Sequence, residues 1–145
     1  MSKAILLDTS AWLTWSQDEA GADEVETYFE EAIHGEATLH SSFVSLTELE
    51  YITTQKFGTG KARELLEFVE EKPVRWHQSD RALCAEAAKL KAMHKVSFAD
   101  AFVAATAQRL SAMLVHKDPE FKTLVGLIKL HGLPPKTGPG AKSTT

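Results

Sequence analysis

The feature that most constrains the fold is a regular alternation of short apolar runs with longer segments of helical periodicity. Apolar runs too short for a helix are typical of buried strands, and they occupy residues 4–7, 37–40, 74–76 and 113–115, with a weaker one at 127–130. Helical spacing is predicted for residues 9–16, 18–33, 43–57, 60–71, 80–94 and 98–110. Strands that alternate with helices favour a mostly parallel sheet covered on both faces, which is an α/β/α sandwich.

The length of 145 residues fits a single domain with one hydrophobic core. Three of the five prolines fall near the C-terminal end, together with glycines and lysines. We therefore expect a folded domain over residues 1–132 and a disordered Pro/Gly/Lys tail over 133–145. No run approaches the roughly 18 apolar residues of a membrane helix, and the single cysteine, Cys84, suits a reducing compartment. These features predict a cytoplasmic protein.

Charge is distributed unevenly along the chain. Acidic residues outnumber basic ones 20 to 16, which argues against a protein that coats nucleic acids through a general positive charge. Eight acids and no lysine or arginine lie between residues 17 and 36, a pattern that most simply indicates a solvated helix face. A phosphate backbone would have to approach basic residues elsewhere, and few such contacts predict weak binding with a shallow salt dependence.

Two aspartates follow predicted strands. Asp8 ends the first apolar run, and Asp118 lies just beyond the run at 113–115. Ligands of a parallel sheet bind outside the carboxyl ends of its strands, so both aspartates are predicted at one edge. The alternative for each is a helix N-cap, and for Asp118 this alternative is supported by Pro119 at the first helical position.

Two further acids lie on apolar helix faces. Asp100 is surrounded by alanine, valine and phenylalanine, and its alternative role is a capping box with Ser97. Glu48 lies in the middle of a predicted helix with apolar residues one turn to either side, and its alternative is a core-edge glutamate neutralised by a lysine or arginine. A charge in such surroundings must be paired, bind a cation or become protonated.

The four acids are more informative together than separately. Carboxylates brought into one pocket repel each other and raise each other's pKa values unless a cation holds them. Hard oxygen ligands without a cysteine or histidine cluster favour Mg²⁺ or Mn²⁺ over zinc. A carboxylate site with such ions is typical of enzymes of phosphoryl chemistry. The residues themselves therefore indicate a metal-dependent hydrolase.

The chain resembles the PIN-domain ribonucleases at four places in the same order. Residues 8–11 (DTSA) are similar to the first motif of that family, and residues 46–51 (LTELEY) to the second. Residues 99–107 (ADAFVAATA) resemble the third motif, and residues 114–121 (LVHKDPEF) the fourth. The similarity extends from about residue 3 to residue 130. The residues of the four motifs look most like those of VapC, the toxin of type II toxin–antitoxin pairs.

The resemblance implies a PIN-like α/β/α sandwich and an Mg²⁺- or Mn²⁺-dependent endoribonuclease. It implies that Asp8, Glu48, Asp100 and Asp118 bind the metal, with the hydroxyl of Ser10 near them. Water would then attack a phosphodiester in line and leave a 5′-phosphate and a 3′-hydroxyl. The resemblance also implies an RNA substrate, a homodimer and a VapB-like antitoxin that occupies the cleft.

Several residues depart from the family pattern or are better explained by packing. Glu120 stands two places after Asp118, and a metal role and a solvent-facing position in the first helical turn are equally open for it. His116 stands where many relatives have a small polar residue, and the sequence indicates no role for it. The three tryptophans, Trp12, Trp15 and Trp76, lie in apolar runs and are predicted as core or dimer contacts rather than base-stacking platforms.

Three other functions compete with a toxin nuclease. An aspartyl-phosphate phosphatase of the haloacid dehalogenase type also begins with a strand ending in aspartate, but it needs a second acid where this chain has Ser10. A PIN-domain nuclease of RNA maturation or decay would carry the same four motifs. A non-catalytic PIN-like binding module would use the acids only as helix caps.

Overall fold

The computed structural model of the chain describes residues 2–135. Five parallel strands form one sheet in the order β3-β2-β1-β4-β5. Their bounds are β1 Lys3–Leu7, β2 Ala37–Ser42, β3 Val74–His77, β4 Met113–His116 and β5 Leu130–Gly132. The chain builds outward from β1 through β2 to β3 and then adds β4 and β5 on the opposite side of β1. The predicted parallel sheet is confirmed, and its strand order reverses between β1 and β4.

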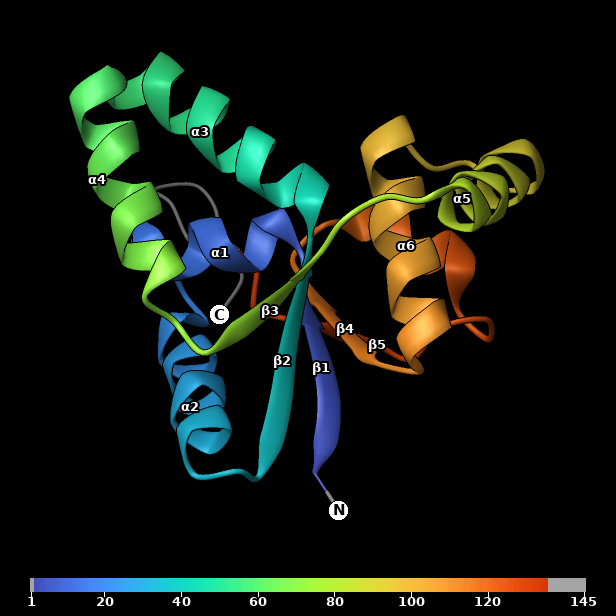
Figure 1. Cartoon of the computed structure of the whole chain (residues 1–145), viewed down its shortest axis with the longest axis horizontal. Helices are drawn as coiled ribbons and strands as arrows, with labels where there is room; N and C mark the ends of the chain where they lie inside the picture. The colour runs from blue at the N-terminus through green and yellow to red at the C-terminus, as the bar shows by residue number, and fades with distance from the viewer. Residues whose placement is uncertain (1, 136–145) are drawn as a thin grey trace.

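Helices cover both faces of the sheet, as Figure 1 shows. One face packs against α1 Thr9–Ser16, α2 Ala22–Ile33, α3 Phe43–Phe57 and α4 Thr59–Glu70. The other face packs against α5 Arg81–Met93 and α6 Phe98–Leu110, and a short 3₁₀ helix, η1 Pro119–Leu124, follows β4. The α/β/α sandwich predicted from the alternation of apolar runs and helical segments is therefore confirmed.

The central strand β1 is apolar because both of its faces are buried. Ile5 and Leu7 belong to the core under α1–α4, whereas Leu6 belongs to the core under α5 and α6. Trp12 is fully buried on the first side, where its ring stacks on Trp76 at 5.7 Å between centroids. The predicted core position is confirmed for Trp12, whereas Trp15 and Trp76 are half-buried and contact its ring.

Two predicted boundaries differ from the structure by three or more residues. Helix α2 begins at Ala22 rather than at residue 18, because Asp18 (φ 52°) and Gly21 (φ 105°) adopt left-handed turn conformations. The last strand begins at Leu130 rather than at residue 127. Gly126, with φ 94°, makes a turn there, and this turn leaves Leu127 exposed at the surface. In both places the sequence pattern predicts one continuous helix or strand, but part of that segment forms a turn in the structure.

The end of the domain is fixed to the sheet. Leu133 is buried, and its backbone N–H donates to the carbonyl oxygen of His116 at 2.7 Å. Residues 136–145, which make up most of the expected tail, lie outside the described residues. No helix within residues 2–135 is both long enough and apolar enough to cross a bilayer.

Candidate metal centre

Asp8 and Asp118 lie at the carboxyl edge of the sheet. Asp8 directly follows β1, and its backbone N–H donates to the carbonyl oxygen of Val115 on β4 at 3.0 Å. Asp118 lies two residues beyond the end of β4. The two strands flank the point where the strand order reverses, and connections leaving such a point diverge and open a crevice. The topology therefore places both aspartates where a ligand of this fold would bind.

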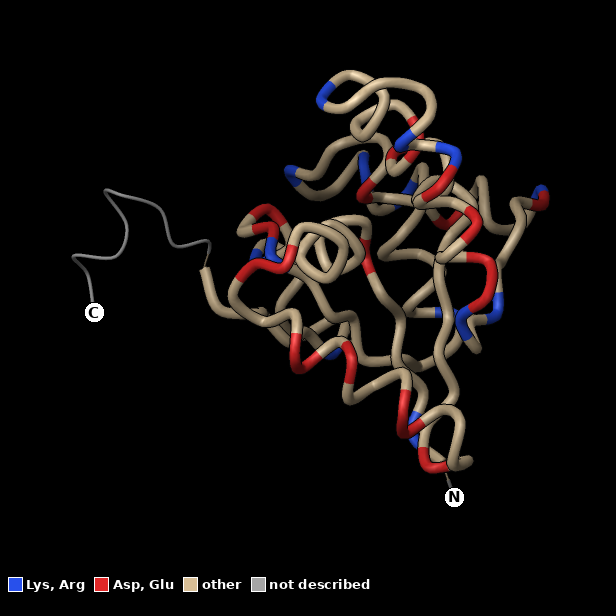
Figure 2. The backbone as a smooth tube through the Cα atoms, turned by 90° about the vertical axis from the view of Figure 1, so that its left-hand side faces the viewer, with Lys and Arg blue, Asp and Glu red and all other residues tan. Residues whose placement is uncertain are grey.

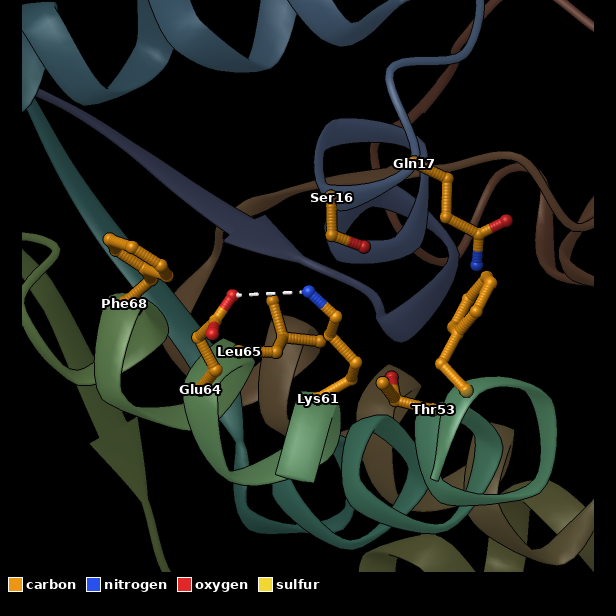
Figure 3. Close-up of a pocket in the computed structure, with 8 residues that line it drawn as sticks. Ser16, Gln17, Thr53, Lys61, Glu64, Leu65 and Phe68 are labelled. Carbon is orange, nitrogen blue, oxygen red and sulfur yellow. Dashed lines mark ion pairs between the residues drawn. The ribbon is translucent and has the colours of Figure 1, made fainter. Parts of the chain in front are cut away.

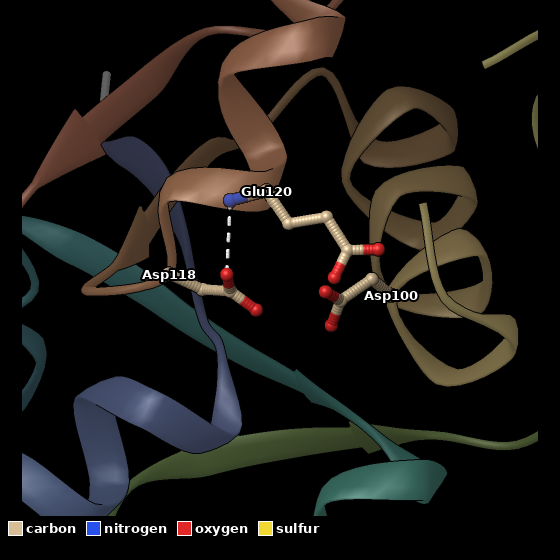
Figure 4. A group of neighbouring side chains, drawn as sticks. All are labelled: Asp100, Asp118 and Glu120. Carbon is tan, nitrogen blue, oxygen red and sulfur yellow. Dashed lines mark hydrogen bonds between the residues drawn. The ribbon is translucent and has the colours of Figure 1, made fainter. Parts of the chain in front are cut away.

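Three carboxylates form a close group at this edge. Asp100, Asp118 and Glu120 each offer an oxygen within 4.8 Å of the other two. Figure 4 shows Asp100 reaching from α6 toward Asp118 and Glu120, which come from the turn after β4 and the start of η1. Asp100 is buried, and the other two are half-buried. This geometry brings oxygen ligands from two separate elements within reach of one cation.

Asp8 adds a buried carboxylate with one oxygen unsatisfied. Its Oδ2 accepts hydrogen bonds from the backbone N–H of Ser10 at 3.0 Å and from the Ser10 hydroxyl at 2.5 Å. Its Oδ1 is buried, and no donor among the described residues reaches it. Burial raises the pKa of Asp8 to about 6, with smaller contributions from Glu48 and Asp118, although the two bonds from Ser10 oppose the shift. An oxygen of this kind lacks the partner that a buried polar atom normally has.

The pKa of Asp100 depends on its burial and on the charges of the neighbouring acids. Burial is the largest cause that raises the pKa of Asp100, the neighbouring charges of Asp8, Asp118 and Glu120 act in the same direction, and together they bring it to about 9. None of the ion pairs in the described part of the chain involves these four carboxylates. The group is therefore a concentration of negative charge that protons or a cation must neutralise.

Glu48 lies beside the group rather than within it. Its half-buried side chain comes from α3, and its Oε1 accepts a hydrogen bond from the Thr9 hydroxyl at 2.6 Å. Its charge raises the pKa of Asp8, so the two carboxylates are close enough to interact. The structure thus brings all four predicted acids to the same edge of the sheet. Their roles as metal ligands remain a prediction.

Helix capping and cation binding are compatible here. Asp8 caps α1 through Oδ2, and Asp118 caps η1 by accepting from the N–H of Glu120 at 2.9 Å. At α6 the cap is Ser97, whose hydroxyl accepts from the N–H of Asp100 at 3.1 Å. Each aspartate therefore keeps carboxylate oxygen available for a ligand. Helix capping by Asp8 and Asp118 is confirmed, and it does not exclude a role of the same side chains in cation binding.

Glu120 and His116 contribute more than the sequence indicates. Glu120 lies in the close group because its N–H bonds to Asp118 and the short turn directs both side chains the same way (Figure 4). His116 is buried at the end of β4, and its Nδ1 accepts from the N–H of Asp118 at 3.1 Å. In the sequence, the position of Glu120 two residues after Asp118 is the feature that points to a metal role. An imidazole that accepts a backbone hydrogen bond leaves no comparable pattern in the sequence.

These residues fit a hard divalent cation. The donors are carboxylate oxygens, no sulfur or imidazole belongs to the close group, and the orphaned Oδ1 of Asp8 lacks a positive partner. Mg²⁺ and Mn²⁺ prefer such oxygen ligands. The arrangement suits chemistry in which negative charge develops on a phosphate group.

A separate groove lies between the end of α1 and the α3–α4 hairpin (Figure 3). Its volume is about 380 Å³, and its lining includes Phe57, Leu65 and Phe68. Lys61 and Glu64 form an ion pair of 3.9 Å along one side. Phe57 and Phe68 are both exposed, so this groove presents apolar surface to the outside.

The chain matches the family model described as PIN domain over residues 5–127. Its fold is similar to that of VapBC2 from Rickettsia felis, with a TM-score of 0.72, 14% identity, and coverage of 90% of this chain and 99% of that chain. It is also similar to VapBC from Salmonella typhimurium, with a TM-score of 0.69, 17% identity, and coverage of 91% and 98%. A third similar structure is VapC20 from Mycobacterium tuberculosis, named a Sarcin-Ricin loop cleaving toxin, with a TM-score of 0.67, 18% identity, and coverage of 86% and 97%. No curated protein sequence matches the chain.

Proposed function

From the PIN-domain family, to which this chain belongs over residues 5–127, we propose that the protein is a divalent-metal-dependent endoribonuclease. The observation that carries the proposal is the convergence of buried and half-buried carboxylates with no ion-pair partner among the described residues. A fold needs no such group for stability, because uncompensated buried charge is unfavourable. The presence of this acidic group is more simply explained by a ligand that it binds.

Asp8, Asp100 and Asp118 would hold the ion, and the position of Glu120 suits the same role. Mg²⁺ or Mn²⁺ would supply positive charge that stabilises the phosphate in the transition state and makes water more acidic. Ser10 keeps Asp8 in place, because its hydroxyl donates to Oδ2 while accepting from the N–H of Lys117 at 2.8 Å. The carboxylates would orient a water and a phosphodiester relative to each other, which is the positioning that such a reaction requires.

The proposal extends to a toxin of the VapC type acting in the cytoplasm on RNA. Several similar folds carry names of VapBC complexes, which supports a VapB-like antitoxin as partner. The groove lined by Phe57, Leu65 and Phe68 offers exposed apolar surface that a partner segment would cover. A homodimer is part of the same proposal.

The nuclease activity is tested with purified protein and RNA in Mg²⁺, Mn²⁺ or EDTA. We expect cleavage only with a divalent ion, and we expect Asp100→Asn to lower the rate at least about 100-fold. Asp23→Asn is the matched control, because Asp23 is an exposed aspartate on α2. Cleavage that persists in EDTA, or full activity of Asp100→Asn, would contradict the metal mechanism.

The toxin role is tested by inducing the chain alone in a bacterium. Growth should stop with the wild-type protein and continue with Asp100→Asn at equal expression. Sequencing of RNA ends shortly after induction should show a small set of new 5′ ends. Normal growth at confirmed wild-type expression, combined with cleavage in vitro, would instead support a nuclease of RNA maturation or decay.

A further inference from the structure

Two buried hydroxyls connect the first residue of α1 to the acid of α3. The Ser45 hydroxyl lies 2.7 Å from Thr9 Oγ1, and Thr9 Oγ1 lies 2.6 Å from Glu48 Oε1. Ser45 is fully buried and Thr9 is 5% exposed. Ser45 and Glu48 are one turn apart on α3, so both face the start of α1.

The direction of this hydrogen-bond chain follows from its members. Thr9 donates its only hydroxyl proton to Glu48. In the contact with Ser45, Thr9 must therefore accept, and Ser45 must donate. The result is a chain of two bonds that runs from Ser45 through Thr9 to Glu48. Hydrogen bonds linked in this way polarise and strengthen one another.

Two other buried threonines form a different kind of bond. The hydroxyls of Thr14 and Thr106 each donate to a backbone carbonyl one turn earlier in their own helix, at 2.8 Å in both cases. Thr9 begins its helix and donates instead to a carboxylate from a distant part of the chain. Its neighbour in sequence is Asp8, so one short segment fixes both carboxylates.

We propose that Thr9 and Ser45 are positioning residues that hold Glu48 in a fixed orientation at the edge of the acidic site, an inference that rests on the proposed nuclease function. A glutamate side chain has three rotatable bonds, and Glu48 has no ion pair among the described residues to restrain it. With Oε1 held by Thr9, Oε2 would be the oxygen that meets a metal ion or its water. The two hydroxyls thereby set where Glu48 acts relative to Asp8.

The test compares variants of the full chain by Mn²⁺ affinity, measured calorimetrically, and by the kcat and KM of RNA cleavage. Thr9→Val keeps the shape of the side chain but removes the hydroxyl. We expect kcat to fall about 10-fold with KM within about twofold, and Mn²⁺ binding to weaken several-fold. Thr9→Ser keeps the hydroxyl and should stay within about threefold of the wild type. Thr106→Val, which removes a buried hydroxyl bonded only to backbone, is the control and should bind Mn²⁺ normally.

A double-mutant cycle separates positioning from general packing. If Thr9 acts through Glu48, then Thr9→Val should have no further effect on kcat in a Glu48→Ala background. Ser45→Ala should change kcat in the same direction as Thr9→Val and should also lose its effect in that background. It provides the same comparison if Thr9→Val does not fold.

The outcomes distinguish this inference from the proposed function. A wild-type protein that neither binds Mn²⁺ nor cleaves RNA would overturn both. An active wild type with Thr9→Val at normal kcat and Mn²⁺ affinity would overturn the positioning role alone. An equal loss of kcat from Thr9→Val with and without Glu48 would do the same.

Discussion

Asp8 and Asp100 carry the same chemical group in different surroundings. Asp8 receives two hydrogen bonds from Ser10, which stabilise its charge and limit its pKa to about 6. Burial and then the charges of Asp8, Asp118 and Glu120 raise the pKa of Asp100 to about 9, and within residues 2–135 no hydrogen bond from a donor such as Ser10 opposes them. Near neutral pH the metal-free site therefore keeps a proton on Asp100 while Asp8 is mostly ionised. A cation that enters must displace this proton, so metal binding should release protons to solution.

Two histidines near the edge of the sheet, His40 on β2 and His77 on β3, have pKa values that burial lowers, so burial favours their neutral forms. His40 Nδ1 lies 2.8 Å from His77 Nε2, and His40 Nε2 lies 3.1 Å from the hydroxyl of Thr38. That hydroxyl donates to the carbonyl oxygen of Lys3, so it accepts from Nε2–H and leaves Nδ1 as an acceptor for His77. Burial lowers the pKa of His40 to about 4, helped by the charge of Arg75 and by the repulsion that two protonated rings of the pair would exert on each other. The pair is therefore held together by neutral rings.

Acid should weaken the fold through His40. An unfolded histidine takes up a proton below about pH 6.5, whereas His40 in the folded protein does so only near pH 4. Stability from this group is therefore present above pH 6.5 and lost as the pH falls toward 4. We expect the stability advantage of wild type over His40→Gln to be about 1–3 kcal/mol larger at pH 7 than at pH 4.5, as measured by urea unfolding.

The exposed His34 provides the control for this measurement. His34→Gln changes an exposed histidine outside the pair and should have the same stability relative to wild type at both pH values. An advantage over His40→Gln that did not change with pH would contradict the account of the histidine pair.

At the scale of elements, α1 depends on tertiary contacts. A helix of 8 residues is too short to be stable by itself in water. Trp12 anchors it through stacking on Trp76 and through an indole N–H that donates to the Ser41 hydroxyl at 2.8 Å. Because α1 also carries Thr9 and Ser10, its anchoring affects the acidic site as well as the core.

Trp12→Ala should destabilise the protein by about 3–5 kcal/mol, because it opens a cavity and leaves the Ser41 hydroxyl without its donor. The free energy of unfolding from urea titration measures this effect. Phe57→Ala removes an exposed aromatic residue of α3 and should cost no more than about 0.5 kcal/mol. Equal costs for the two variants would show that α1 is not anchored as described.

At the scale of the whole molecule, acidic residues concentrate on α2. Figure 2 shows acidic and basic positions interspersed over most of the backbone, whereas α2 carries five acids and no lysine or arginine. The α3–α4 hairpin carries three basic residues among five acids, so RNA phosphates would meet repulsion along α2 and no net attraction at the hairpin. The predicted solvated acidic face is thus partly used in folding, since Glu31 pairs with Lys3 at 3.2 Å and Glu26 accepts from Trp15 at 2.7 Å.

The stability of the whole protein should depend on pH and divalent ions together. Asp8 and Asp100 have folded-state pKa values above their ordinary value of 3.8, so the stability they contribute is present below pH 4. It is lost as the pH rises through about 6 for Asp8 and about 9 for Asp100. A cation removes this penalty. We expect Mg²⁺ to raise the Tm little at pH 5 and by several degrees at pH 8, measured against EDTA in a thermal unfolding series.

Asp100→Asn provides the comparison. It removes the most strongly perturbed carboxylate, so the metal-free variant should be more stable than metal-free wild type at pH 8 and should gain less from Mg²⁺. An Mg²⁺ effect of equal size at pH 5 and pH 8 would contradict the linkage between protons and metal.

Much of the architecture could be predicted because it depends on local patterns. The bounds predicted for α1, α3 and α6 match the structure, since apolar spacing, Gly58 and the Ser97 cap are all visible in the sequence. The start of α2 could not be predicted, because the left-handed conformations of Asp18 and Gly21 depend on how the turn closes. The strand after Gly126 was misplaced for the same kind of reason.

The sequence by itself determined the alternation of strands and helices, the buried strand β1 and the acids that follow it. Those features depend on hydrophobic period and on residues close together in the chain. Only the tertiary structure decided which oxygen of Asp8 lacks a partner, that Glu120 joins Asp100 and Asp118, and that Thr9 bonds to Glu48. These contacts depend on the strand order and on the packing of helices distant in sequence, and neither leaves a periodic signal along the chain.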